Sequence, residues 1–362
     1  MTDVDGAAPG VVRDALRSRD PFPGTAGFAG ELDGALVRDV LGRRPVFSDR
    51  ESPESWSFDP TALRAPVAVP AGHVRDGATE RAVWSLPDPE PSAPEDALAA
   101  VRDAVRASVR SVDADGVAVA FSGGVDSAVV AAGVPDAPLY VAGFEGCHDV
   151  AAAREAAAAM NRDLRVVDLG HEDLRRAVPE IVRATGRRNP MDVQIALPLF
   201  LVAERVAADG YDRLAVGQGA DELFGGYAKV VDPATDDRVD ADTVRGARRE
   251  TVLTLPDQLE RDVLTLRAAG VEPVAPLLHD RVVDAAGRLP ADCIATPDER
   301  KVALRRAADG LVPESVRAAD KKAVQYGTYV SRELDRLARQ AGFKRRMDNH
   351  VGKYVESLLT EG

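Results

Sequence analysis

Four short apolar runs alternate with alanine-rich or amphipathic segments in the middle of the chain. The runs span residues 117–121, 139–144, 164–169 and 214–216. Apolar strands separated by helices are typical of a parallel sheet covered by helices on both faces. The sequence therefore predicts an α/β fold with a doubly wound parallel sheet, in which ligands bind at the carboxyl ends of the strands.

The regions on either side of these runs have a different character. Residues 1–91 are rich in Pro, Gly and short apolar runs, which predicts a small β-rich N-terminal domain. Residues 92–362 form the second predicted domain, and its first helix is expected to begin at Ser92 with a capping box to Glu95. The apolar face of that helix repeats at Leu98, Val101, Val105, Val109 and Val112. Beyond about residue 240 the strand pattern stops and helical periodicity predicts a C-terminal helical lobe.

Composition narrows the class of protein. The formal net charge of −13 is spread along the chain, which disfavours a nucleic-acid-binding surface. There is no apolar run of about 18 residues and no signal-peptide pattern, so we expect a cytoplasmic protein without a membrane span. Only six of the 46 Lys and Arg residues are lysines, and this scarcity together with the acidic surplus is typical of halophilic proteins. Cys147 and Cys293 lie in no metal-binding pattern and are expected to be buried thiols.

A glycine-rich loop follows the first strand of the predicted sheet. The run VAVAF leads directly into Ser122-Gly-Gly-Val-Asp-Ser127 and then into an apolar helix. Glycines let backbone amides approach an anion, serines add hydroxyl donors, and the helix directs its positive end toward a phosphate. The loop lacks the lysine of a GxxxxGK[ST] motif and the GxGxxG of a dinucleotide site. It therefore predicts a pyrophosphate cradle, against the alternative of an ordinary strand-to-helix turn.

A second glycine-rich loop, at residues 217–227, follows the fourth strand and contains Asp221 and Glu222. Magnesium prefers oxygen ligands and commonly bridges one or two carboxylates to phosphate oxygens. Asp126 and Asp221 are the pair that we expect to bind it. The alternative is that these acids only cap a helix beginning near Leu223.

The two loops together resemble a known family. SGGVDS is shared by ATP pyrophosphatases, and GQGADELFGGY resembles the motif of the synthetase domain of asparagine synthetases, with a resemblance that covers about residues 92–330. This implies an ATP-dependent enzyme that adenylates a carboxylate, releases pyrophosphate and lets an amine displace AMP. It also implies magnesium at Asp126 and Asp221. The resemblance further implies that Ser122, Gly123, Gly124 and Ser127 hold pyrophosphate. It also implies backbone contacts from Ala142 and Gly217 to adenosine, and Gln218 is a further expected ATP contact.

Two further segments carry the resemblance. The segment GVEPVAPLLHD at residues 270–280 is similar to GLEARVPFLDHR, which implies that Glu272 helps to deprotonate the attacking amine. Alternatively, Glu272 is a solvated loop acid. The segment DKKAVQYG at residues 320–327 resembles the lysine-bearing loop of the same enzymes. This implies that Lys321, or Lys322 as the alternate, stabilises charge on the α-phosphate and pyrophosphate, unless the two are a solvated basic pair.

The N-terminal residues resemble a shortened glutaminase domain without its catalytic groups. The segments 36–47 and 69–73 look like structural strands of that domain, but residue 2 is Thr2 and no cysteine precedes Cys147. We therefore expect the domain to be inactive and the nitrogen to come from free ammonia, another amine or a separate glutaminase. Aspartate is the favoured carboxylate, and a homo-oligomer is left open.

Three other functions compete with this reading. A β-lactam-synthetase-like enzyme would use an intramolecular amine, and such relatives also keep a glutaminase-like domain without the activity. They carry Tyr where this chain has Gln218. A tRNA-thiolating enzyme would need catalytic cysteines and a basic surface. A non-catalytic regulator would bind ATP without cleaving it.

Overall fold

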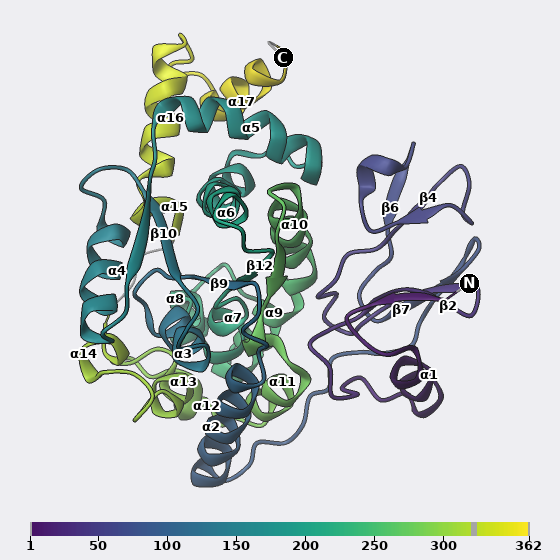
Figure 1. Ribbon diagram of the computed structural model, residues 1–362. Helices are drawn as coiled ribbons and strands as arrows, with labels where there is room; N and C mark the ends of the chain where they lie inside the picture. Colours follow the sequence, from purple (N-terminus) through teal and green to yellow (C-terminus); the bar gives the residue numbers. More distant parts are fainter. Residues whose placement is uncertain (1, 320–323, 361–362) are drawn as a thin grey trace.

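The computed structural model describes residues 2–319 and 324–360, and its centre is a five-stranded parallel sheet (Figure 1). The strands lie in the order β11-β10-β9-β12-β13, and each registered pair is parallel. Their bounds are β9 Val117–Ala120, β10 Leu139–Gly143, β11 Leu164–Asp168, β12 Arg213–Ala215 and β13 Glu272–Val274. The four predicted strands are therefore present, with β9 at the centre of the sheet.

Helices cover both faces of this sheet. Ala118, Tyr140 and Leu214 contribute to one core, with residues of α5 (His171–Thr185), α6 (Pro190–Ala208), α16 (Val330–Gln340) and α17 (His350–Thr360). Val117, Val119 and Leu139 contribute to the other, with residues of α2 (Pro94–Arg110), α3 (Val125–Gly133) and α4 (His148–Ala159). Successive strand residues thus point to opposite faces. The predicted doubly wound α/β fold is confirmed.

The first helix of this domain differs from the expectation at its start. The helix α2 begins at Pro94 with Ala93 as its N-cap, and no side chain caps it. The Ser92 amide instead donates to the carbonyl oxygen of Arg288, so this residue joins the chain to a neighbouring segment and the predicted capping box is wrong. The predicted apolar face is correct at Val101, Val105 and Val109, which are buried.

The C-terminal part is mostly helical but contains one strand that we did not expect. The strand β13 pairs in parallel with β12 at the edge of the sheet. It has three residues, too few for an alternation to be visible, and it includes Pro273, which edge strands tolerate. The helices here are α7 Ala220–Phe224, α8 Ala228–Val231, η2 Pro233–Thr235, α9 Val244–Leu253, α10 Leu255–Ala268, η3 Pro276–Leu278, α11 Asp280–Gly287, α12 Ala291–Ile294, α13 Val302–Ala307, α14 Glu314–Arg317 and α15 Val324–Gly327.

The N-terminal region is a small domain beside α10 and α11 (Figure 1). Antiparallel sheets β1-β2-β3-β7-β8 and β5-β4-β6 make up most of it. Their bounds are β1 Asp3–Asp5, β2 Ala29–Leu32, β3 Ala35–Arg38, β4 Phe47–Asp49, β5 Trp56–Ser57, β6 Pro66–Ala68, β7 His73–Asp76 and β8 Thr79–Ala82. Short strands were expected, whereas helix α1 (Pro9–Ser18) was not. A short turn, η1 (Pro60–Ala62), completes the domain.

A buried ionic triad joins the two domains. The Arg43 guanidinium donates to Asp39 at 2.8 Å and to Asp280, the first residue of α11, at 2.7 Å. All three side chains are buried. Asp280 also accepts hydrogen bonds from the amides of Gly24 and Thr25. Each carboxylate is thereby paired and hydrogen-bonded, as burial of charge requires.

The two cysteines agree with the expectation from the sequence. Cys147 and Cys293 are both buried free thiols, as expected, and burial raises the pKa of each. None of the helices described is long and apolar enough to cross a membrane.

Candidate active site

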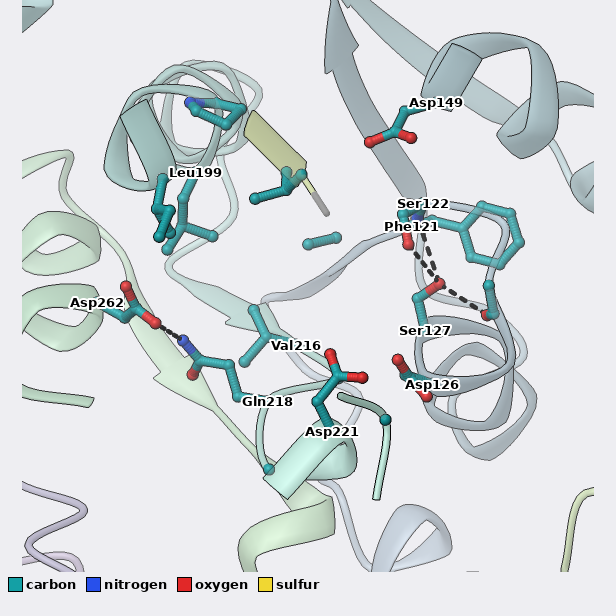
Figure 2. Close-up of a pocket in the computed structure, with 18 of the residues that line it drawn as sticks. Phe121, Ser122, Asp126, Ser127, Asp149, Leu199, Val216, Gln218, Asp221 and Asp262 are labelled. Carbon is teal, nitrogen blue, oxygen red and sulfur yellow. Dashed lines mark hydrogen bonds between the residues drawn. The ribbon is translucent and has the colours of Figure 1, made fainter. Parts of the chain in front are cut away.

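A cavity of about 510 Å³ lies at the carboxyl ends of the central strands (Figure 2). The loop after β9 and the start of α3 form one wall, and α6 and α10 form the opposite wall. The loop between β12 and α7 lies between them. Both glycine-rich loops therefore face one cavity, at the edge where open α/β folds bind their ligands.

The loop after β9 is folded around Ser127. The Ser127 hydroxyl accepts from the Ser122 amide at 3.2 Å and donates to the Gly124 carbonyl at 3.1 Å. Gly123 has a φ of +78°, and a Cβ there would lie 2.6 Å from the carbonyl oxygen of Ala152. Glycine is thus required for both conformation and space. The loop presents the amino end of α3 to the cavity, which favours an anion.

The second loop packs directly against the first. A Cβ on Gly217 would lie 2.9 Å from the Cβ of Asp126, so this glycine lets the two loops touch. Gly219 adopts a φ of +86° and is the N-cap of α7. The helix begins at Ala220, and neither Asp221 nor Glu222 caps it. The alternative that these acids merely cap a helix near Leu223 is therefore wrong.

The two predicted metal-binding carboxylates meet at one lysine. Lys301 Nζ lies 2.6 Å from Asp126 Oδ2 and 2.7 Å from Asp221 Oδ1. The Lys301 side chain is 12% exposed. Its burial disfavours the charge, but the two carboxylates outweigh that effect and raise the pKa of Lys301 above its ordinary value. A cation is therefore held between carboxylates contributed by both loops.

Glu222 has a different role in the same loop. It is buried, and Oε1 accepts a hydrogen bond of 2.6 Å from the Tyr227 hydroxyl. Burial, together with the negative charge of Asp221, raises the pKa of Glu222 to about 7. This hydrogen bond joins Glu222 to Tyr227 at the end of the loop.

A polar pair lies on the wall opposite the phosphate loop. Gln218 Nε2 donates to Asp262 Oδ2 at 2.5 Å, and Figure 2 shows this pair extending between the loop after β12 and α10. Arg261 Nε donates to Asp262 Oδ1 at 2.7 Å. Arg261 also pairs with Asp192 at 2.8 Å. Asp262 is thus a carboxylate that reaches the cavity and is held in place from behind.

The structure brings most of the predicted ATP contacts together. The cavity is lined by Ser122, Gly124, Asp126, Ser127, Ala142, Gly217, Gln218 and Asp221. Gly123 lies within the same loop, against α4. Lys321 and Lys322 lie outside the described residues, so their role remains a prediction.

Glu272 is not in this cavity, which corrects its expected place. It is the first residue of β13, pairs in register with Arg213 and so lies at the amino end of a parallel strand. Its side chain is 49% exposed and forms an ion pair with Arg267 at 2.8 Å. The carboxyl ends of the strands carry the cavity, so Glu272 lies at the opposite edge of the sheet.

Two residues of the cavity were missed from the sequence. Lys301 stands alone in a segment without a recognised motif, and its signal was only the scarcity of lysine in the chain. Asp262 follows Arg261 in an ordinary amphipathic helix and gives no local signal. Both meet their partners only through the fold, at separations of 175 residues for Lys301 and Asp126 and of 44 for Gln218 and Asp262.

The comparisons with known proteins agree with this geometry. The family model of asparagine synthase matches residues 98–253 and 236–357, which include both loops and the helical lobe. The chain belongs to the asparagine synthase family. The predicted family is thereby confirmed.

Two members of the asparagine synthase family that match this chain have a low sequence identity to it. The putative asparagine synthetase [glutamine-hydrolyzing] 1 of Methanocaldococcus jannaschii is 26% identical over 300 residues, which cover 72% of this chain and 54% of that protein. Asparagine synthetase B [glutamine-hydrolyzing] of Escherichia coli is 23% identical over 218 residues, covering 55% and 39%. The chain thus spans about half the length, or less, of these relatives. A solved structure of NMN synthetase from Francisella tularensis matches with a TM-score of 0.33 and 12% identity, covering 75% of this chain and 94% of that one.

Proposed function

We propose that this protein activates a carboxylate with ATP and then transfers the acyl group to an amine. In the first step a carboxylate oxygen attacks the α-phosphorus of ATP and pyrophosphate leaves. In the second step the amine nitrogen attacks the acyl carbon and AMP leaves, giving an amide. The observation that supports this most strongly is the meeting of the phosphate loop, Asp126, Asp221 and Lys301 in one cavity at the carboxyl edge of the sheet.

The phosphate end of the cavity fits the first step. The amino end of α3 and the hydroxyls of Ser122 and Ser127 would hold the departing pyrophosphate. The Lys301 ammonium lines the same cavity and is positively charged at neutral pH, so it would offset the negative charge that builds during bond cleavage. Lys321 and Lys322 remain proposed to contribute at the same place.

The two carboxylates also fit magnesium. Asp126 Oδ1 is buried and has no hydrogen-bond partner, and Asp221 faces the same ammonium group. No group of three or more His, Cys, Asp or Glu side chains that could hold a metal occurs among the described residues. Magnesium bound with a nucleotide needs only one or two carboxylates, because phosphate oxygens and water complete its shell. Asp126 and Asp221 would hold the ion, which supplies positive charge against the phosphates when bound.

Asp262 is the proposed proton acceptor of the second step, in place of Glu272. An attacking amine must lose a proton, and a carboxylate within hydrogen-bonding reach can take it. Asp262 Oδ2 accepts from the Gln218 amide and could accept from an amine that displaces it. Gln218, a neutral amide, cannot take the proton and would position the amine.

A second cavity gives the amine a route to this pair. It has a volume of about 420 Å³, and Gln218 and Leu259 line both cavities. Arg43 and Arg44 of the N-terminal domain also line this second cavity. The family resemblance by itself predicts ammonia, either free or from a separate glutaminase, as the nitrogen donor and aspartate as the carboxylate.

The test is carboxylate-dependent exchange of labelled pyrophosphate into ATP, followed by detection of AMP and amide after ammonia is added. A panel of carboxylic acids should reveal at least one that supports exchange. A β-lactam-synthetase-like enzyme would form its product without added amine. ATP binding without exchange for any acid would favour the non-catalytic regulator and refute the proposal.

A further inference from the structure

The wall of the active-site cavity opposite the phosphate loop carries apolar side chains beside the Gln218–Asp262 pair. On α6, Ile195, Pro198, Leu199 and Val202 line the cavity. Their spacing of three or four residues places them on one face of the helix. On α10, Leu255 and Leu259 line it at a spacing of four, followed by Asp262 three residues later. The proposed amine-binding carboxylate is therefore bordered by leucine side chains.

Four positively charged side chains line the cavity in the described part of the chain, and all four already have partners. Each donates to an oxygen atom of the protein. Arg261 pairs with Asp262 and Asp192, and Lys301 pairs with Asp126 and Asp221. Arg300 donates to the Gly226 carbonyl, and Arg305 donates to the carbonyls of Arg300 and Ala319.

The arrangement disfavours a substrate with two carboxylates. One carboxylate of such a substrate must reach the α-phosphate, and the other would then lie near the leucines and Asp262. The α-ammonium group of aspartate can pair with Asp262, but its second carboxylate would meet no cation that is not already paired within the described part of the lining. Burial of an unpaired charge is strongly unfavourable. An alkyl or aryl group would instead contact Leu255 and Leu259.

We infer that the acid activated by this enzyme is a monocarboxylate with an apolar substituent, which packs on Leu255 and Leu259 of α10. The inference rests on the proposed adenylation of a carboxylate in this cavity. The family resemblance implies that adenosine contacts Ala142 and Gly217, which line the cavity near the ends of β10 and β12, and this would leave the α10 face for the acyl group. Discrimination comes from the apolar wall and from Asp262, which repels a second carboxylate.

Stable analogues of the acyl adenylate test this inference at equilibrium. Acyl-sulfamoyl adenosines would be prepared with aspartyl and with straight-chain alkanoyl groups of two to six carbons, and their dissociation constants measured by calorimetry with the full chain. Affinity should rise about fourfold for each added methylene until the wall is covered. The best alkanoyl analogue should bind at least about tenfold more tightly than the aspartyl one.

Three variants test whether the preference for alkanoyl groups comes from this wall of the cavity. Leu259→Ala should weaken binding of the best alkanoyl analogue by about tenfold or more and leave adenosine sulfamate unchanged. Ile195→Ala, at a partly exposed position on the α6 part of the same wall, serves if Leu259→Ala does not fold. Leu253→Ala removes an exposed leucine outside the cavity and should change neither affinity.

Each outcome decides a different point. Equal or tighter binding of the aspartyl analogue overturns the inference while it supports adenylation in this cavity. Binding of all acyl analogues no better than adenosine sulfamate overturns the proposed function, and the inference with it. A preference for alkanoyl groups that Leu259→Ala and Ile195→Ala leave intact overturns the assignment to this wall.

Discussion

Replacing Lys301 with methionine is the most direct test of the site, because it removes a buried cation and nearly preserves the side-chain length. The two aspartate oxygens lie 2.6 and 2.7 Å from Lys301 Nζ. They are thus no more than about 5 Å from each other, and two charges at that distance repel by about 3 kcal/mol at an effective dielectric constant of about 20. Asp221 is 46% exposed, so solvent reduces this value. We expect Lys301→Met to lower the free energy of unfolding by about 2 kcal/mol.

The assay is urea denaturation of Lys301→Met with and without millimolar Mg²⁺. The divalent ion should restore stability to the variant more than to the wild type, because it binds the two freed carboxylates in the folded state only. Pyrophosphate exchange should fall by about 10²–10³-fold. Lys353→Met changes an exposed lysine of α17 and is the matched control. If Lys301→Met unfolded at the wild-type urea concentration and retained exchange, the bridging role of Lys301 would be refuted.

Three further changes test other parts of the site. Asp126→Asn and Asp221→Asn should each lower pyrophosphate release at least about a hundredfold by removing a magnesium ligand, with unchanged circular dichroism; normal turnover by both would exclude the metal assignment, and Asp113→Asn, on an exposed loop, is the control. Asp262→Asn should retain exchange and lose amide formation, whereas Glu272→Gln should retain both, and the reverse pattern would return the proton-accepting role to Glu272. Cys147 and Cys293 should react with a thiol reagent at pH 8 only after denaturant is added, because both are buried; rapid labelling of the native protein would contradict that burial.

The sequence predicted those parts of the site that are built from contiguous residues. The Ser122–Ser127 loop carries its own strand, turn and helix signals, so its place at the edge of the sheet could be inferred before the fold was known. Lys301 could not be found in this way, because its contacts with Asp126 and Asp221 arise from tertiary packing. Glu272 was misplaced because a motif match does not say at which end of a strand a residue lies. The strand β13 was too short to show a period, and Pro273 argued against it.

The triad of Arg43, Asp39 and Asp280 makes the stability of one domain depend on the other. Asp280, at the start of α11, has as partners the Arg43 guanidinium and the amides of Gly24 and Thr25, all from the N-terminal domain. Loss of one partner from a buried ion pair costs about 3–5 kcal/mol when the other charge stays buried, a large part of the stability of a typical domain. A point change such as Arg43→Leu in the full chain therefore has this cost, whereas deletion of residues 1–91 would expose Asp280 to water. In the intact chain the stability of the second domain thus depends on one guanidinium of the first.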